Sequence, residues 1–134
     1  MRQELLSTQD AVDEALGCHY PMASTCPPYG EPYFRNPGML PVFQGVVRRQ
    51  ELFVVMWTED SQDWLLTEQP ERVVQNAVQD RVSKGRNGTD RVIIFHDAHQ
   101  QTVEALPEII DHYRESGGQF TDVNELLANK YLGE

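Results

Sequence analysis

A histidine and an aspartate stand together at the end of an apolar run, in the stretch VIIFHD that spans residues 92–97. Four consecutive apolar residues predict a buried strand, so His96 and Asp97 lie where that strand opens to solvent. A histidine tuned by a nearby carboxylate can act as a general acid. The alternative is a polar turn without chemistry. His99 adds a second imidazole, but no further ligands stand at the spacing that a metal site needs.

A second polar group, TEDSQDW, follows the apolar run LFVVMW of residues 52–57. Asp60 and Asp63 are three residues apart, and such carboxylates can orient and charge a neighbouring histidine. Trp64 beside them offers a flat apolar wall on which sugars stack. The alternative is a solvated acidic turn that is anchored by one tryptophan.

A third group lies in the proline-rich stretch CPPYG of residues 26–30. Its two prolines fix the backbone, so that a following N–H can be held toward an oxyanion. The alternative is an ordinary proline-rich turn. Arg35, in YFRNP, is a cation that can pair with a carboxylate.

The elements that must position these groups alternate along the chain. Gly17 is the expected stop of a first helix, and Pro107 predicts a kink or a late start in a later one. The full order is a helix ending at Gly17, a shaped loop over 18–41 with six of the eight prolines, a helix over 42–49, a strand over 52–57, a helix from Pro70 to Gly85, a strand over 92–95, a helix carrying Val103, Leu106, Ile109, Ile110 and Tyr113 up to Gly117, a strand over 119–123, and a helix capped by Asn124.

This alternation predicts βα units with right-handed crossovers and a parallel sheet. The continuous apolar character of residues 52–57 predicts a strand covered on both faces. In such folds chemistry gathers at the carboxyl ends of the strands. Both TEDSQDW and HDAH directly follow predicted strands, and this position favours a functional role for them over that of isolated surface residues.

The net charge of the chain limits the kinds of molecule that it is expected to bind. The 134 residues suit one domain, and the formal net charge is −10, from 11 Lys and Arg against 21 Asp and Glu. Such a chain repels phosphate backbones and anionic lipid, so we expect no nucleic-acid or membrane partner. A neutral glycan is compatible with this charge.

The sequence carries few signals of location. No apolar run approaches the roughly 20 residues of a membrane span, and the N-terminus lacks the apolar core of a signal peptide. We therefore expect a cytoplasmic chain, unless a leader was removed. Cys18 and Cys26 are expected to be free thiols, with a loop disulfide as the alternative in an oxidising compartment. A glycosylation sequon at residues 87–89 matters only after secretion.

The order PPYG, DSQDW, an apolar pair with HD, TVEALPEII and G-x-F resembles the polysaccharide deacetylases of the NodB-homology group. This family includes chitin, chitooligosaccharide and peptidoglycan deacetylases, and the resemblance covers nearly the whole chain. It implies an α/β fold, namely a partial (β/α) barrel that corresponds to the C-terminal portion of the family. Residues 1–134 then form one truncated domain.

The resemblance also implies roles for particular residues. His96 matches the general acid that protonates the leaving amine, and Asp60 matches the carboxylate that tunes this histidine. Ile94 matches the residue that shapes the acetyl pocket. Trp64 matches the groove wall, and Tyr29 matches the residue whose backbone N–H serves the oxyanion.

Two departures set this chain apart from the family pattern. The arginine that precedes PPYG in the family is replaced here by Cys26. Either Arg35 substitutes for it, or YFRNP is the true equivalent and PPYG is an insertion. The family's Asp-Asp pair and His-x-x-x-His segment, which supply the base and the metal ligands, have no counterpart before Gly17. The family barrel also needs roughly 200 residues or more.

The resemblance thus implies a metal-dependent carbohydrate N-deacetylase that keeps its acid side and lacks its metal and base side. We expect no metal site in the chain itself; zinc binds only if a site is rebuilt or completed by another chain. One hypothesis is a truncated deacetylase that is inactive alone. The other is a non-enzymatic glycan-binding or assembly module. Open strand edges favour a homodimer or association with another chain.

Overall fold

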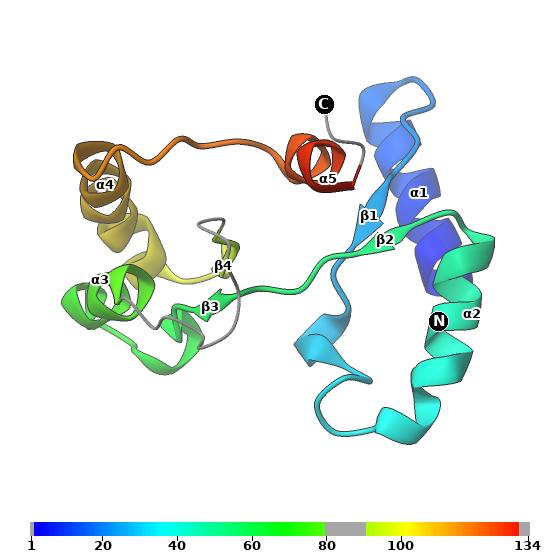
Figure 1. Cartoon of the computed structure of the whole chain (residues 1–134), viewed down its shortest axis with the longest axis horizontal. Coiled ribbons are helices and arrows are strands. Elements are labelled where there is room, and N and C mark those ends of the chain that lie inside the picture. Colours follow the sequence, from blue (N-terminus) through cyan, green and yellow to red (C-terminus); the bar gives the residue numbers. More distant parts are fainter. Residues whose placement is uncertain (1, 80–90, 132–134) are drawn as a thin grey trace. The chain divides into compact units, whose positions relative to one another are not determined.

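The computed structural model describes residues 2–79 and 91–131, and the chain divides into two compact units. The first unit takes in the chain up to Met56 together with the residues from Thr121 onward, and the second is Trp57–Phe120 (Figure 1). Within the described ranges, no helix is long and apolar enough to cross a membrane. Whether the two units act as one domain stays a prediction.

The first unit combines helices with a short parallel pair of strands. Strands β1 and β2 pair in parallel, with Ser24 opposite Phe53. The helix α1 ends as predicted at Gly17, whose φ of 68° suits glycine. The elements are α1 (Arg2–Leu16), β1 (Ser24–Thr25), the 3-10 helices η1 (Pro28–Gly30) and η2 (Pro37–Met39), α2 (Leu40–Arg49), β2 (Phe53–Val54) and α5 (Val123–Tyr131).

The proline-rich loop is shaped by packing on α2. The buried face of this helix consists of Phe43, Val46 and Val47, at helical spacing. The ring of Tyr33 meets the ring of Phe43 edge to face, with 5.9 Å between the centroids. An aromatic residue of the loop therefore anchors it to the helix that follows.

The second unit consists of two consecutive βα arrangements. Strands β3 (Glu59–Asp60) and β4 (Ile93–Ile94) pair in parallel, with Asp60 opposite Ile94. After β3 come the 3-10 helix η3 (Asp63–Leu65) and the helix α3 (Pro70–Val78), and after β4 comes α4 (Gln100–Glu115). Pro70 opens α3 as predicted, at a position where its missing N–H costs no helical bond.

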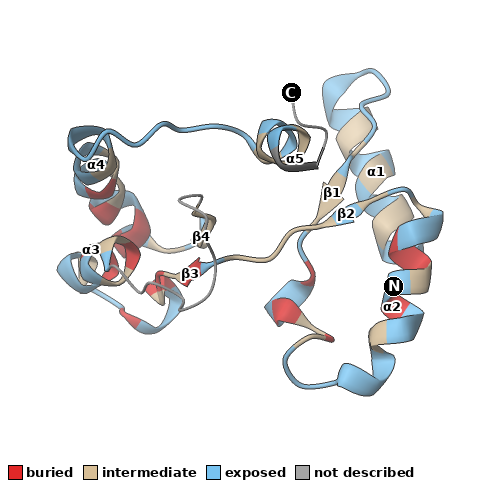
Figure 2. Ribbon diagram, viewed as in Figure 1, coloured by how far each residue is buried: buried red, intermediate tan, exposed pale blue. Residues whose placement is uncertain are grey.

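The core of this unit lies between α3 and α4, where Figure 2 shows the buried positions of both helices. Tyr113 Oη donates a hydrogen bond of 2.7 Å to the carbonyl oxygen of Ala77, which ties the two helices together. Small and branched side chains allow the helices to approach closely; they are Val73, Val74, Ala77, Ala105 and Ile109, and Leu66, which precedes α3, belongs to the same cluster.

The strands differ from the prediction. The run 52–57 contains only the short strand β2, and neither this run nor 92–95 is fully buried. The expectation that 52–57 is covered on both faces is therefore wrong for the chain alone. Among the described residues each strand is two residues long and has one hydrogen-bonded neighbour, so little of it is enclosed.

The helix α4 also corrects the prediction. It begins at Gln100 and runs through Pro107, so the late start is wrong. Pro107 leaves the carbonyl of Val103 without its helical donor, but both residues are exposed, so that solvent can bond this oxygen. The buried residues are Gln101, Thr102, Ala105 and Ile109, and the predicted core residue Val103 faces solvent.

The predicted strand over 119–123 is absent, because residues 119–122 are irregular and α5 begins at Val123. Asp122 caps this helix instead of Asn124, since its Oδ1 accepts the Glu125 N–H at 2.9 Å. The helix α3 ends at Val78, and Gln79 leaves the helical conformation with ψ 126°, so the predicted helix running without a break from Pro70 to Gly85 is wrong. Gly85 itself, the following turn and the sequon lie outside the described residues.

Candidate functional site

Two polar segments meet at one edge of the β3–β4 pair. Because the strands are parallel and Asp60 lies opposite Ile94, the residues that follow each strand emerge on the same side. Asp63 opens η3 after β3, and His96 lies two residues beyond the end of β4. The predicted position after 52–57 is wrong in detail, because the strand that pairs with β4 is formed by Glu59 and Asp60 of TEDSQDW itself and not by the run 52–57. The residues that follow β3 and β4 nevertheless lie together, as the contact between Asp63 and His96 shows.

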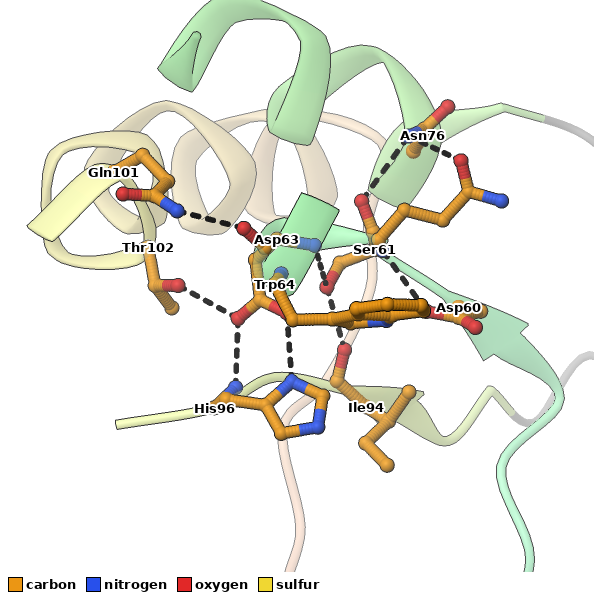
Figure 3. A network of polar contacts seen from close by, with 10 residues as sticks. Asp60, Ser61, Asp63, Trp64, Asn76, Ile94, His96, Gln101 and Thr102 are labelled. Carbon is orange, nitrogen blue, oxygen red and sulfur yellow. Dashed lines mark hydrogen bonds and ion pairs between the residues drawn. The ribbon is translucent and has the colours of Figure 1, made fainter. Parts of the chain in front are cut away.

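Asp63 is the centre of this site and is completely buried. Its Oδ2 accepts hydrogen bonds from the main-chain N–H of His96 and from Thr102 Oγ1, both at 2.6 Å (Figure 3). Its Oδ1 accepts the N–H of Trp64 at 2.9 Å and lies 2.7 Å from His96 Nδ1. Two oxygens thus receive four donors, as an ionised carboxylate can.

His96 is held through one ring nitrogen only. With an ionised Asp63 as its partner, Nδ1 carries a hydrogen, and Figure 3 shows Nε2 on the side of the ring that faces away from Asp63. The side chain is 43% exposed. The arrangement therefore presents Nε2 to an external group while Nδ1 is fixed.

The pKa of Asp63 lies below its ordinary value. Burial alone raises this pKa, but the hydrogen bonds from Thr102 and from the main chain and ring of His96 favour the ionised form and outweigh burial. A carboxylate that stays ionised beside Nδ1 accepts its hydrogen and fixes the orientation of the imidazole.

Buried and partly buried polar side chains hold the main chain around Asp63. Ser61 is fully buried and donates from Oγ to the carbonyl oxygen of Ile94 at 2.7 Å. Asn76 of α3 donates to the carbonyl of Ser61 at 3.1 Å, and Gln101 of α4 donates to that of Asp63 at 2.7 Å. The loop after β3 is thus bonded to β4, α3 and α4.

The structure corrects the role expected for Asp60. Its Oδ1 accepts the N–H of Gln62 at 2.9 Å, which closes a local turn. Gln62 takes a left-handed conformation with φ 56°, and the chain then directs Asp63 inward. The carboxylate that contacts His96 is therefore Asp63 and not Asp60.

Trp64 and Ile94 lie in the same unit as His96. The Trp64 side chain is 51% exposed, as a sugar-stacking wall requires, and the Ile94 side chain is partly buried. The ring centroid of His99 is 6.0 Å from that of His96. The groove and acetyl-pocket roles stay predictions.

Tyr29 and Arg35 belong to the first unit, so their relation to His96 also stays a prediction. Tyr29 is exposed and has φ 58°, a left-handed conformation that is uncommon for tyrosine. Arg35 is exposed, and its Nε lies 3.9 Å from Glu31 Oε1, a weak surface pair.

The described ranges 2–79 and 91–131 contain no group of three or more His, Cys, Asp or Glu side chains that could hold a metal ion. A metal that the resemblance implies therefore does not fit this part of the chain. Cys18 and Cys26 are free thiols, and both residues are exposed. Neighbouring atoms shield the thiol of Cys26 from part of the solvent, and this desolvation raises its pKa.

Four residues of the network were missed by reasoning from the sequence: Ser61, Asn76, Gln101 and Thr102. Gln101 and Thr102 share the buried face of α4 with Ala105 and Ile109, at helical spacing. Polar residues on an apolar stripe were the signal, because a buried polar group requires a hydrogen-bond partner.

The chain is similar in sequence and in fold to proteins that act on carbohydrates. The chain is 31% identical over 101 residues to a peptidoglycan-N-acetylglucosamine deacetylase from Bacillus cereus, a match that covers 75% of this chain and 36% of that protein. A family 4 carbohydrate esterase from Streptomyces lividans, solved in complex with acetate, superposes with a TM-score of 0.68 at 27% identity, over 91% of this chain and 55% of that one.

A polysaccharide deacetylase from Bacillus cereus superposes with a TM-score of 0.70 at 27% identity, over 88% of this chain and 54% of that one. This chain therefore spans about half the length of these two structures. No family model matches the chain.

Proposed function

We infer that this chain, a polysaccharide deacetylase-like protein, holds the proton-donating half of a site that removes N-acetyl groups from a glycan. The observation that carries this proposal is the contact between His96 Nδ1 and the buried Asp63, made at the carboxyl edge of two parallel strands. This pair positions a ring nitrogen for proton transfer.

Hydrolysis of an N-acetyl group adds water across the amide carbonyl and breaks the C–N bond. The departing nitrogen must gain a proton, because an amide anion is a very poor leaving group. In the proposed step His96 donates this proton from Nε2 and becomes neutral, while Asp63 holds Nδ1–H throughout. Acetate and a free amine are the products.

Activation of the attacking water is not assigned to the described residues. The family resemblance implies a metal ion here, which would polarise the carbonyl and lower the pKa of a bound water. Since the described residues contain no fitting ligand set, we propose that turnover requires ligands and a base from another polypeptide segment.

For the substrate we propose a neutral N-acetylated glycan. A net charge of −10 disfavours polyanions, and the exposed Trp64 follows Asp63 directly, within reach of a sugar ring bound beside His96. The same exposed tryptophan favours the second candidate, a module that binds the glycan without turnover.

We further propose that the strands belong to a partial (β/α) barrel that associates with a second copy of the chain. Phe53 is half exposed, and residues 92–95 are only partly buried. Apolar strands in this state gain stability when a partner covers them. Light scattering at micromolar concentration should give twice the chain mass of 15.4 kDa; a monodisperse monomer contradicts this proposal.

A graft tests the proposed function. This chain replaces the matched segment of the Bacillus cereus peptidoglycan-N-acetylglucosamine deacetylase, and acetate release from an N-acetylglucosamine oligomer is measured. We expect the graft to be active and His96→Ala to lower activity by about 10²–10⁴-fold, the range for general acid catalysis. His99→Ala is the matched control. A folded graft that binds the oligomer without releasing acetate favours the binding module.

A further inference from the structure

Thr102 makes a contact that the proton-donating pair does not itself explain. Its Oγ1 donates to Asp63 Oδ2 at 2.6 Å, on the carboxylate oxygen that does not face the His96 ring (Figure 3). Thr102 is 3% exposed, and it lies in the first turn of α4, six residues after His96. A hydroxyl is therefore enclosed against the carboxylate, where solvent cannot take its place.

The role of the Thr102 hydroxyl depends on whether Asp63 is ionised. An ionised carboxylate has no hydrogen to give, so Thr102 must donate. A protonated Asp63 would need an acceptor for its hydrogen, and the two main-chain N–H groups that face its oxygens can only donate. The two main-chain N–H groups therefore favour the ionised carboxylate, and the Thr102 hydroxyl adds a further donor to it.

We propose that Thr102 is a positioning residue that fixes Asp63 as an ionised, single-rotamer carboxylate and through it sets the Nδ1–H form of His96. The inference rests on the proposed function for its catalytic meaning, since a fixed Nδ1–H leaves Nε2 as the nitrogen that exchanges protons with the substrate. The direction of the Asp63 pKa agrees, because Thr102 is the largest of the causes that lower it.

Gln101 provides a matched control from the same helical turn. Its Nε2 donates at 2.7 Å to the main-chain carbonyl of Asp63, and it is 6% exposed. Thr102 and Gln101 thus make hydrogen bonds of similar length and burial to the same residue. Only the first of these bonds reaches the carboxylate, so only its loss should change the titration of Asp63.

The test is a carbon-detected NMR titration of the Asp63 carboxyl in the full chain. We expect Thr102→Val to move the midpoint to higher pH, Thr102→Ser to restore it, and Gln101→Met to leave it at the wild-type position. A folded Thr102→Val with an unchanged midpoint overturns the proposal. An equal shift in Gln101→Met also overturns it, because the effect then belongs to packing.

If Thr102→Val does not fold, the wild-type hydroxyl proton of Thr102 decides. A slowly exchanging resonance that moves as Asp63 titrates supports the proposal, and a rapidly exchanging one overturns it. The titration needs no deacetylation, so its outcome is separate from that of the graft. An inactive graft with a positive titration refutes the proposed function and leaves the effect of Thr102 on Asp63 intact.

Discussion

Replacing Asp63 by asparagine removes one acceptor from a site that needs two. Oδ1 accepts the Trp64 N–H, and Oδ2 accepts the His96 N–H. Whichever oxygen becomes the amide NH₂ of the new side chain, it then faces one of these main-chain N–H groups, donor against donor. The ring of His96 and the hydroxyl of Thr102 can reverse their roles, but a main-chain N–H cannot.

The magnitude follows from the burial of this site. A buried donor left without an acceptor costs about 1–3 kcal/mol, and hydrogen bonds to a charged group contribute about 1.5–3 kcal/mol. Since Asp63 is 0% exposed, solvent does not compensate. We expect Asp63→Asn to lower the free energy of unfolding by about 2–4 kcal/mol, which is large for one isosteric change.

Asp60→Asn is the matched control, because it changes the carboxylate that the resemblance had placed beside His96. Asp60 accepts one N–H, and the amide oxygen of asparagine can accept the same bond. We expect a change within about 0.5 kcal/mol. Urea unfolding followed by fluorescence of Trp57 and Trp64 measures both variants. An Asp60→Asn cost equal to or above that of Asp63→Asn refutes the assignment.

Two further predictions concern the titration of Asp63 and the close packing at Gly118. The pKa of Asp63 is lowered in the folded state, so its contribution to stability is fully present above the ordinary carboxyl value of 3.8 and is lost as the pH falls through the folded value. Lowering the pH across this range should therefore reduce the free energy of unfolding of the wild type more than that of Asp63→Asn. An equal loss in both contradicts this reading. At Gly118 an added Cβ would lie 2.8 Å from the carbonyl oxygen of Tyr113, so Gly118→Ala should cost about 1–3 kcal/mol in thermal or urea unfolding, whereas Gly38→Ala, with nothing within 4 Å, should be within about 0.5 kcal/mol. Equal costs at the two glycines would exclude the steric cause.

Local signals in the sequence predicted the order of most elements. Pro70 and Gly17 mark a helix start and a helix stop, and both are confirmed because each acts through its own backbone geometry. The prediction of a strand over 119–123 was wrong, because a short stretch of mixed apolar and polar residues does not indicate whether a neighbouring strand is there to pair with it. Pro107 failed as a helix boundary because solvent at its exposed position replaces the lost bond.

The location of the site was predictable, whereas its internal pairing was not. Chemistry at the ends of two parallel strands follows from topology, and it brought Asp63 and His96 together. The choice between Asp60 and Asp63 depends on the left-handed turn at Gln62, which no spacing rule specifies. The hydrogen bond from Thr102 depends on which face of α4 is buried, and this face includes Thr102 and not the predicted Val103.

The central claim is that Asp63 holds Nδ1–H of His96 and leaves Nε2 for proton transfer. Nitrogen-15 NMR of the histidine ring at a pH where the imidazole is neutral measures this most directly. The account predicts hydrogen on Nδ1 with unprotonated Nε2, and loss of this preference in Asp63→Asn. Hydrogen on Nε2 in the wild type, with Nδ1 as an acceptor, would contradict the account.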